Sequence, residues 1–255
     1  MPETMPELND ADWLERIEAP GRRPAVGVVA PFDMELDAEL WRWLPRGVDL
    51  LMTRTPYVEG EVTIEFAREV SGFADIEIGV RSVTAGRVDT VAYACTSGSF
   101  VGGRSGEAVL AAAMRAAGAA EAVTTSGAVV EAFSALGIDR VSVATPYLPE
   151  LSALLENVLG EHGVGVAGHL AMGRGSDIWA ISYREVVELA RAADRPDAQA
   201  ILLSCTNLPT YDIIVPLERE LGKPVVSANQ ATMWAALRRM GLAAHGPGQT
   251  LLGVV

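Results

Sequence analysis

The hydrophobic positions of this chain form short, β-branched runs that alternate with longer segments of helical periodicity. Short apolar runs are typical of buried strands, while apolar residues spaced three and four apart indicate helices. Strict alternation of the two is typical of an α/β fold built on parallel sheets. The first part of the chain predicts strands at 25–30, 48–53, 88–94, 122–125 and 140–144, and helices at 37–44, 63–80, 107–117 and 128–136.

The second half of the chain repeats the order of motifs found in the first half. The sequence pairs are AVGVVAP with RVSVATP, VAYACTSG with ILLSCTNL, and TTSGAVVEAFSALG with SANQATMWAALRRMG. The last pair consists of helix-like segments that both end in glycine, at Gly137 and Gly241. A repeated order of strands and helices predicts two similar structural units within one chain.

We therefore predict an α/β fold of two pseudo-symmetric lobes, at residues 24–137 and 138–255, each a parallel sheet flanked by helices. The last helix of each half is able to cross over and pack on the other lobe. Residues 1–23 are expected to form a polar arm with one short helix near 12–17. The active site is expected in the cleft between the lobes, where ligands of such folds bind.

Both cysteines of the chain stand at the same point of the repeated pattern. Cys95 in VAYACTSGSFVGG and Cys205 in ILLSCTNLPT each follow a predicted strand and precede small hydroxyl, Gly or Asn residues. Helix N-termini and the free N–H groups of turns favour a thiolate over a thiol. A lone cysteine is most often a small apolar core residue, but two at matched strand ends favour a catalytic pair.

Two thiols on opposite sides of a cleft suit stereochemical work on a carbon acid. One thiolate removes a proton from Cα, and the opposite thiol returns a proton to the other face. The same arrangement allows a thiolate to attack an activated alkene while the second thiol handles the proton. Both reactions require thiols whose pKa values lie near the working pH.

Polar residues near the predicted strand ends are candidates for binding a substrate carboxylate. Their hydroxyl and backbone N–H groups can form an anion-binding site, although the same residue types also cap helices and form turns. Asp33 and Tyr147 follow the first strand of each copy and are expected at the same rim. The predicted substrate-binding residues are Asp33, Thr96, Ser97, Tyr147, Thr206 and Asn207, with Ser126, Asn229 and Gln230 as weaker candidates.

Composition and charge narrow the class of partner. A net charge of −13 disfavours nucleic acid and anionic membranes, which are bound through basic surfaces. No apolar run approaches the ~20 residues of a membrane span, and the acidic N-terminus lacks the features of a signal peptide, so a cytoplasmic protein with free thiols is expected. The three histidines are far apart in sequence and no dinucleotide or phosphate-binding glycine motif is present, so neither metal nor cofactor is predicted.

Several of these motifs resemble the aspartate/glutamate racemase superfamily. The two cysteine-bearing strand ends, TPY at 145–147, SANQATMWAAL at 227–237 and GPG at 246–248 are similar to its branch of maleate cis-trans isomerases and arylmalonate decarboxylases. PFDMELDAELWRWLP at 31–45 and TRTP at 53–56 resemble the ectoine-utilisation protein A subgroup. The resemblance covers roughly residues 24–250.

The resemblance implies a cofactor-independent enzyme that holds a small carboxylate between two cysteines, and a homo-oligomer of two or more copies. Cys95 matches the first-lobe cysteine, which is the nucleophile in maleate isomerases, and Cys205 matches the second-lobe cysteine. Tyr147 matches a substrate-binding tyrosine. Decarboxylases of this branch keep only the second cysteine, so the presence of Cys95 favours isomerase or racemase chemistry.

Two departures from the family pattern change the expected substrate. Asp33 stands where maleate isomerases carry a carboxylate-binding asparagine, and a second such asparagine is replaced near Gly175. An ionised Asp33 repels a carboxylate and suits an ammonium or hydroxyl group. We therefore predict a racemase or epimerase of a small amino or hydroxy acid, such as an intermediate of ectoine or hydroxyectoine breakdown. The alternatives are maleate-type cis-trans isomerisation, arylmalonate-type decarboxylation and a small-molecule binding protein.

Overall fold

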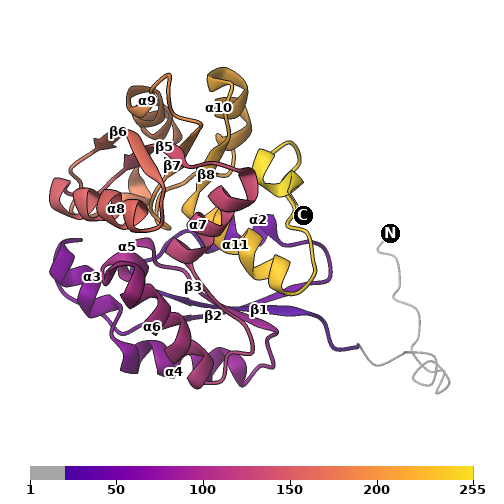
Figure 1. Ribbon diagram of the computed structural model, residues 1–255. Helices are drawn as coiled ribbons and strands as arrows, with labels where there is room; N and C mark the ends of the chain where they lie inside the picture. Colours follow the sequence, from indigo (N-terminus) through magenta and orange to yellow (C-terminus); the bar gives the residue numbers. More distant parts are fainter. Residues whose placement is uncertain (1–20, 255) are drawn as a thin grey trace, which may run out of the picture.

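The computed structural model of the protein describes residues 21–254, which form two α/β lobes, the second drawn above the first in Figure 1. Each lobe contains a four-stranded parallel sheet flanked by helices. The predicted fold of two pseudo-symmetric lobes is therefore confirmed. Most of the predicted arm at 1–23, with its short helix near 12–17, lies outside the described residues.

The first lobe contains the elements β1 (Ala25–Ala30), α2 (Asp37–Trp43), β2 (Asp49–Arg54), α3 (Ile64–Val70), α4 (Phe73–Thr84), β3 (Thr90–Tyr93), α5 (Thr96–Phe100), α6 (Gly103–Ala116), β4 (Ala122–Thr124) and α7 (Thr125–Leu136). The strand order is β2-β1-β3-β4, and all neighbouring strands are parallel. Val28 of β1 pairs with Met52 of β2 on one side and with Ala92 of β3 on the other.

The second lobe contains β5 (Arg140–Thr145), α8 (Pro149–Glu161), β6 (Gly165–Ala171), η1 (Ile178–Ala180), α9 (Tyr183–Ala193), β7 (Ala200–Leu203), α10 (Ile214–Leu221), β8 (Val225–Ser227), α11 (Ala228–Arg239) and η2 (Thr250–Gly253). The strand order β6-β5-β7-β8 repeats that of the first sheet. The repeated sequence motifs therefore occupy equivalent strands: β1 corresponds to β5, and β3 corresponds to β7.

Close packing of helix on sheet explains the burial of β1, which is covered on both faces. Inner strands of parallel sheets are covered by helices on both sides and are therefore apolar throughout. A Cβ on Gly27 would lie 2.8 Å from Val83, and a Cβ on Gly79 would lie 2.7 Å from Val29. Both contacts join β1 to α4, so glycine at these positions lets the helix approach the strand.

The single helix predicted at 63–80 is wrong, because the structure has two helices, α3 and α4, separated at Ser71 and Gly72. Gly72 has a ψ of 121°, which is outside the helical range. The Tyr93 hydroxyl donates a hydrogen bond to the carbonyl of Val70, in the last turn of α3. The apolar spacing continues across this break, so periodicity alone does not reveal it.

The helices that follow the last strand of each lobe, α7 and α11, pack against each other between the two sheets (Figure 1). The hydroxyls of Thr125 and Thr232 lie 2.9 Å apart, and Glu131 accepts hydrogen bonds from Arg238 and Arg239. The exact division of the chain at residue 138 stays a prediction. Between residues 21 and 254, every helix falls short of the length and apolar character that a bilayer crossing requires.

Candidate active site

In each sheet the strand order reverses between the two inner strands, β1 and β3 in the first lobe and β5 and β7 in the second. The segments that follow these inner strands meet in the cleft. In the first lobe, β1 and β3 lead to Asp33 and Cys95; in the second, β5 and β7 lead to Tyr147 and Cys205. Ligands of open parallel sheets bind at such switch points, beyond the carboxyl ends of the strands. All four residues line one cavity, so the fold brings together what the repeated motifs predict.

This cysteine cavity is lined by residues from both lobes and has a volume of about 30 Å³. Such a volume holds about two water molecules. The lining includes all of the predicted catalytic and substrate-binding residues but not the weaker candidates Ser126, Asn229 and Gln230. The residues are Pro31, Asp33, Met34, Val62, Phe66, Cys95, Thr96, Ser97, Tyr147, Ile178, Cys205, Thr206 and Asn207.

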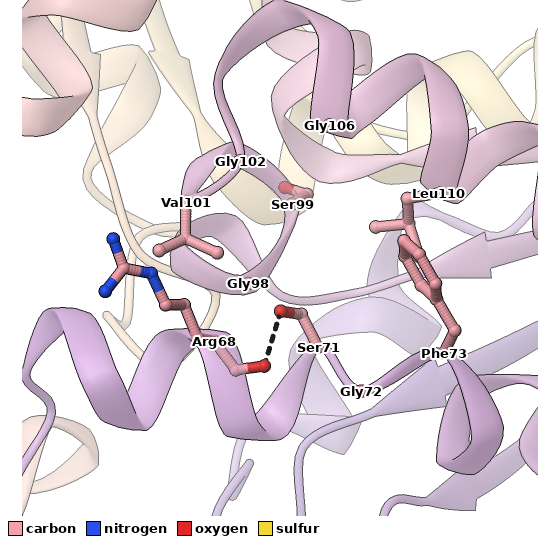
Figure 2. Close-up of a pocket in the computed structure, with 10 residues that line it drawn as sticks. All are labelled: Arg68, Ser71, Gly72, Phe73, Gly98, Ser99, Val101, Gly102, Gly106 and Leu110. Atoms are coloured by element: carbon pink, nitrogen blue, oxygen red, sulfur yellow. Dashed lines mark hydrogen bonds between the residues drawn. The ribbon is translucent and has the colours of Figure 1, made fainter.

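A larger surface pocket, of about 320 Å³, lies on the first lobe and touches neither cysteine (Figure 2). Its walls come from the junction of α3 with α4 and from α5 and α6. Arg68 is its one titratable residue, and the Ser71 hydroxyl donates to the Arg68 carbonyl. Because acid–base and nucleophilic groups are concentrated in the cysteine cavity instead, that cavity is the candidate active site.

Cys95 is the N-cap residue of α5, and its sulfur accepts a hydrogen bond from the Gly98 backbone N–H at 3.3 Å. The Ser97 hydroxyl lies 3.8 Å from the same sulfur. A Cβ at position 98 would lie 3.1 Å from the cysteine sulfur and would collide with the Tyr93 hydroxyl. Glycine is therefore required where the first turn of α5 closes over the thiol.

Cys205 is held in a similar way, by a turn rather than a helix. Its sulfur accepts a hydrogen bond from the Asn207 backbone N–H at 3.3 Å. The segment after it forms turns, and α10 does not begin until Ile214. The N–H contact expected from the motif is therefore present, and a turn supplies it.

Burial raises the pKa of both thiols above the ordinary cysteine value. For Cys205, burial raises the pKa to about 12 despite the opposing effect of the Asn207 N–H. Burial also raises the pKa of Cys95, against the effect of the Gly98 N–H. The expectation that turn amides leave both thiols acidic is therefore wrong for this closed cavity, because desolvation is the larger effect. Both groups are neutral thiols, which donate protons, near pH 7.

Two buried hydroxyl groups are available to bind a ligand. The Thr96 hydroxyl has no hydrogen-bond partner among residues 21–254. The Tyr147 hydroxyl has none of ordinary geometry there but lies close to the Cys205 thiol, and both residues line the cavity. Unpaired buried hydroxyls are costly, and an arriving acceptor such as a carboxylate would satisfy them. Phe100 packs edge-on against the Tyr147 ring, with 6.2 Å between centroids, and limits its movement.

Asp33 and Asn207 face each other across the two lobes. The Asn207 Nδ2 donates to the Asp33 carbonyl at 2.7 Å, and the Glu35 backbone N–H donates to the Asn207 Oδ1 at 3.0 Å. The Asn207 amide thus joins the lobes, and its predicted role in substrate binding stays a prediction. Burial raises the pKa of the Asp33 carboxyl, although its own backbone N–H and the charge of Arg54 lower it.

Segments from both lobes contribute to the wall of the cavity. The Val62 backbone N–H donates to the Gly175 carbonyl at 2.8 Å, within the segment 173–176 that is predicted and found to be a loop. Phe66 and Ile178 complete this wall. The sequence does not distinguish Val62, Phe66 and Ile178 as site residues, because apolar residues that cover a site have the same pattern as ordinary core residues.

Glu39 is a further polar residue near the site that the repeated motifs do not reveal. It is buried, with 6% of its surface exposed, and it accepts hydrogen bonds from the loop that follows Cys205. One feature of the sequence does point to Glu39: this acidic residue lies on the buried face of α2 together with Leu40 and Trp43. A charged residue on an apolar helix face is expected to have specific partners.

These features define a class: a two-lobed α/β protein with two buried thiols at an interlobe site. The chain belongs to the arylmalonate decarboxylase family, whose sequence profile matches residues 70–252. It is 39% identical over 156 residues to arylmalonate decarboxylase of Bordetella bronchiseptica, an alignment that covers 57% of this chain and 62% of that protein. The aligned part is thus less than two-thirds of that relative's length.

Similarity to solved structures extends over most of the chain. A double-substituted arylmalonate decarboxylase in its liganded form is 30% identical, with a TM-score of 0.80, and the match covers 90% of this chain and 98% of that one. A maleate cis-trans isomerase mutant of Nocardia farcinica, with a covalently bound succinylcysteine intermediate, is 26% identical, with a TM-score of 0.79 and coverage of 90% and 98%. The resemblance to this branch of the superfamily is confirmed.

Proposed function

We propose that the protein is a cofactor-independent isomerase that uses Cys95 and Cys205 as a pair of proton-transfer groups on a small carboxylic acid. The observation that carries this proposal is that the two thiols line one cavity, from equivalent strand ends of two similar lobes. The decarboxylase and isomerase relatives support an enzyme of this branch. Two thiols, rather than one, support a reaction with proton transfer at both faces of the substrate.

In the proposed reaction, one cysteine first loses its proton to solvent and reacts as a thiolate, while the other stays a thiol. The thiolate takes the Cα proton, the C–H electron pair moves into the adjacent carboxylate to form an enediolate, and the opposite thiol protonates the other face. The substrate leaves as its mirror image or epimer, and the two sulfur atoms have exchanged protonation states. Burial raises the pKa of Cys205 to about 12, so this thiol stays protonated and is the proton donor when Cys95 is the thiolate.

The substrate proposed for this site carries a carboxylate and a second polar group. The buried hydroxyls of Tyr147 and Thr96 are suited to the carboxylate. Asp33 on the opposite side suits an ammonium or hydroxyl group, because an ionised carboxyl attracts a cation and accepts hydrogen bonds. This chemistry supports an amino or hydroxy acid, and the resemblance to the ectoine-utilisation subgroup supports an intermediate of ectoine or hydroxyectoine breakdown. The resemblance also supports a homo-oligomer.

A second candidate is maleate-type cis-trans isomerisation. The similar structure with a bound succinylcysteine supports it. The Cys95 thiolate would add to one alkene carbon, Cys205 would protonate the other, and rotation about the resulting single bond followed by reversal of both steps would give fumarate. Decarboxylation, which requires one proton-donating thiol, and simple ligand binding are further alternatives.

Proton NMR in D₂O tests these functions with a panel of aspartate, 2,4-diaminobutyrate derivatives, maleate and an arylmalonate. Cα exchange that disappears in both Cys95→Ala and Cys205→Ala is the expected result. Fumarate formed from maleate would favour the second candidate, and loss of CO₂ from the arylmalonate would favour decarboxylation. Binding without any turnover would overturn the enzymatic proposal.

A further inference from the structure

Glu39 belongs to the first lobe in sequence, yet its partners belong to the second. Its Oε1 accepts hydrogen bonds from the backbone N–H groups of Thr210 and Tyr211, both at 2.6 Å. Its Oε2 accepts a hydrogen bond from the Asn229 Nδ2 at 2.9 Å. The hydrogen bonds of this carboxylate thus connect α2 of the first lobe to two parts of the second lobe: the loop that follows Cys205 and the first turn of α11.

A short series of hydrogen bonds leads from this carboxylate to the second cysteine. The Asn229 Nδ2 donates both to Glu39 and, at 2.8 Å, to the backbone carbonyl of Thr206. The next residue, Asn207, donates its backbone N–H to the Cys205 sulfur. Asn229 uses both of its amide hydrogens in this series, and the link to the Thr206 carbonyl fixes the segment that presents an N–H to the thiol.

The hydrogen bonds from position 39 to the Cys205 turn can form only if the side chain at position 39 is a hydrogen-bond acceptor at both of its ends. All partners of Glu39 are donors, so it acts as an acceptor only, as an ionised carboxylate does. A glutamine would turn one of its ends into a donor that faces the Asn229 amide hydrogens. If Asn229 flipped to relieve this contact, its oxygen would face the Thr206 carbonyl, and the link to the loop would be lost.

We propose that Glu39 is a positioning residue for Cys205: it fixes, across the lobes, the turn that supplies the N–H hydrogen bond to this thiol. The proposal rests on the proposed function in that it assigns the acid–base behaviour of Cys205 to a residue of the opposite lobe. Cys95 has its own support within the first lobe, from α5. The two thiols therefore differ in their dependence on position 39.

Reactivity of the individual cysteines, measured on the full chain, tests this role. Wild type and Glu39→Gln are alkylated with iodoacetamide from pH 7 to 10, and mass spectrometry of the peptides gives separate rates for Cys95 and Cys205. In Glu39→Gln the ratio of the Cys205 rate to the Cys95 rate is expected to change by about fivefold or more, the effect of one lost hydrogen bond.

The matched control is Glu218→Gln. Glu218 is also buried and accepts hydrogen bonds from the backbone N–H groups of Val225 and Thr250, but it lies wholly within the second lobe and outside the cavity lining. Its substitution is expected to leave the ratio of cysteine rates within about twofold of wild type, since it removes no contact of the Cys205 turn.

A second variant keeps the proposal testable if Glu39→Gln does not fold. Asn229→Ala leaves the carboxylate on Thr210 and Tyr211 but removes the link to Thr206, and it is expected to change the ratio as Glu39→Gln does. A ratio within about twofold of wild type, or an equal rise at both cysteines, would overturn the positioning role. Cα exchange by the wild type is measured separately, so a changed ratio without any turnover would refute the proposed function and leave the positioning role standing.

Discussion

Asn207 of the second lobe donates a hydrogen bond from its side-chain Nδ2 to the backbone carbonyl of Asp33 in the first lobe, at 2.7 Å. The same side chain accepts a hydrogen bond from the Glu35 N–H, so one amide forms both bonds. Its backbone N–H meanwhile contacts the Cys205 sulfur. Closure of the cleft and the environment of the second thiol are therefore coupled through a single residue.

Replacing Asn207 with alanine is expected to destabilise the protein by about 1–3 kcal/mol, because it leaves two part-buried backbone groups without partners. Chemical denaturation measures this change. The control is Asp212→Asn, which weakens an exposed cross-lobe ion pair with Arg42 and is expected to cost no more than about 1 kcal/mol. Equal losses in the two variants would contradict the role assigned to the Asn207 amide.

The raised pKa of Cys205 predicts a specific loss of stability at alkaline pH. A thiol ionises near 8.5 in the unfolded chain and near 12 in the folded protein. Between these values the folded state binds one more proton than the unfolded state, so stability falls as pH rises. Wild type is expected to lose up to about 1.4 kcal/mol per pH unit more than Cys205→Ser in this window. Denaturation midpoints of both proteins from pH 8 to 11 measure the difference, and parallel curves would contradict the burial of this thiol.

Asp33→Asn is expected to alter the choice of substrate. If Asp33 binds an ammonium or hydroxyl group, its replacement removes a charge-assisted hydrogen bond and lowers kcat/KM for the amino or hydroxy acid by about tenfold or more. Binding of dicarboxylates such as maleate is expected to improve, since a negative charge leaves the cavity. Kinetics of wild type and variant with both substrate types provide the measurement. An unchanged preference would show that the Asp33 carboxyl does not contact the substrate.

Glu131 joins α7 to α11, and its ion pairs predict a stability effect at low pH. Hydrogen bonds from Arg239 and the charges of Arg239 and Arg238 hold the pKa of this carboxyl below its ordinary value. Its contribution is therefore present above the unfolded value of about 4.3 and is lost as pH falls through the folded pKa. Because the pair is partly exposed, Glu131→Gln is expected to cost about 1 kcal/mol or less at pH 7 and nothing near pH 2. Denaturation curves at the two pH values measure this difference.

Much of the fold and part of the site follow from local sequence patterns. Short apolar runs, glycine stops and the duplicated order of motifs predict two parallel α/β lobes. In such sheets the carboxyl ends of the inner strands converge, so residues that follow equivalent strands must lie near one another. This rule explains why Asp33, Cys95, Tyr147 and Cys205 were identifiable from the sequence as one group.

The tertiary structure decided what the local pattern cannot contain. The break between α3 and α4 depends on Tyr93 reaching Val70 from a neighbouring strand. The ionisation of the cysteines depends on how completely both lobes exclude water, and this desolvation outweighs the nearby N–H groups that the motif supplies. The contacts of Glu39 join segments 171 and 190 residues apart. The sequence by itself thus determined which chemical groups reach the cleft, whereas burial and partners from distant segments decided their protonation and their supports.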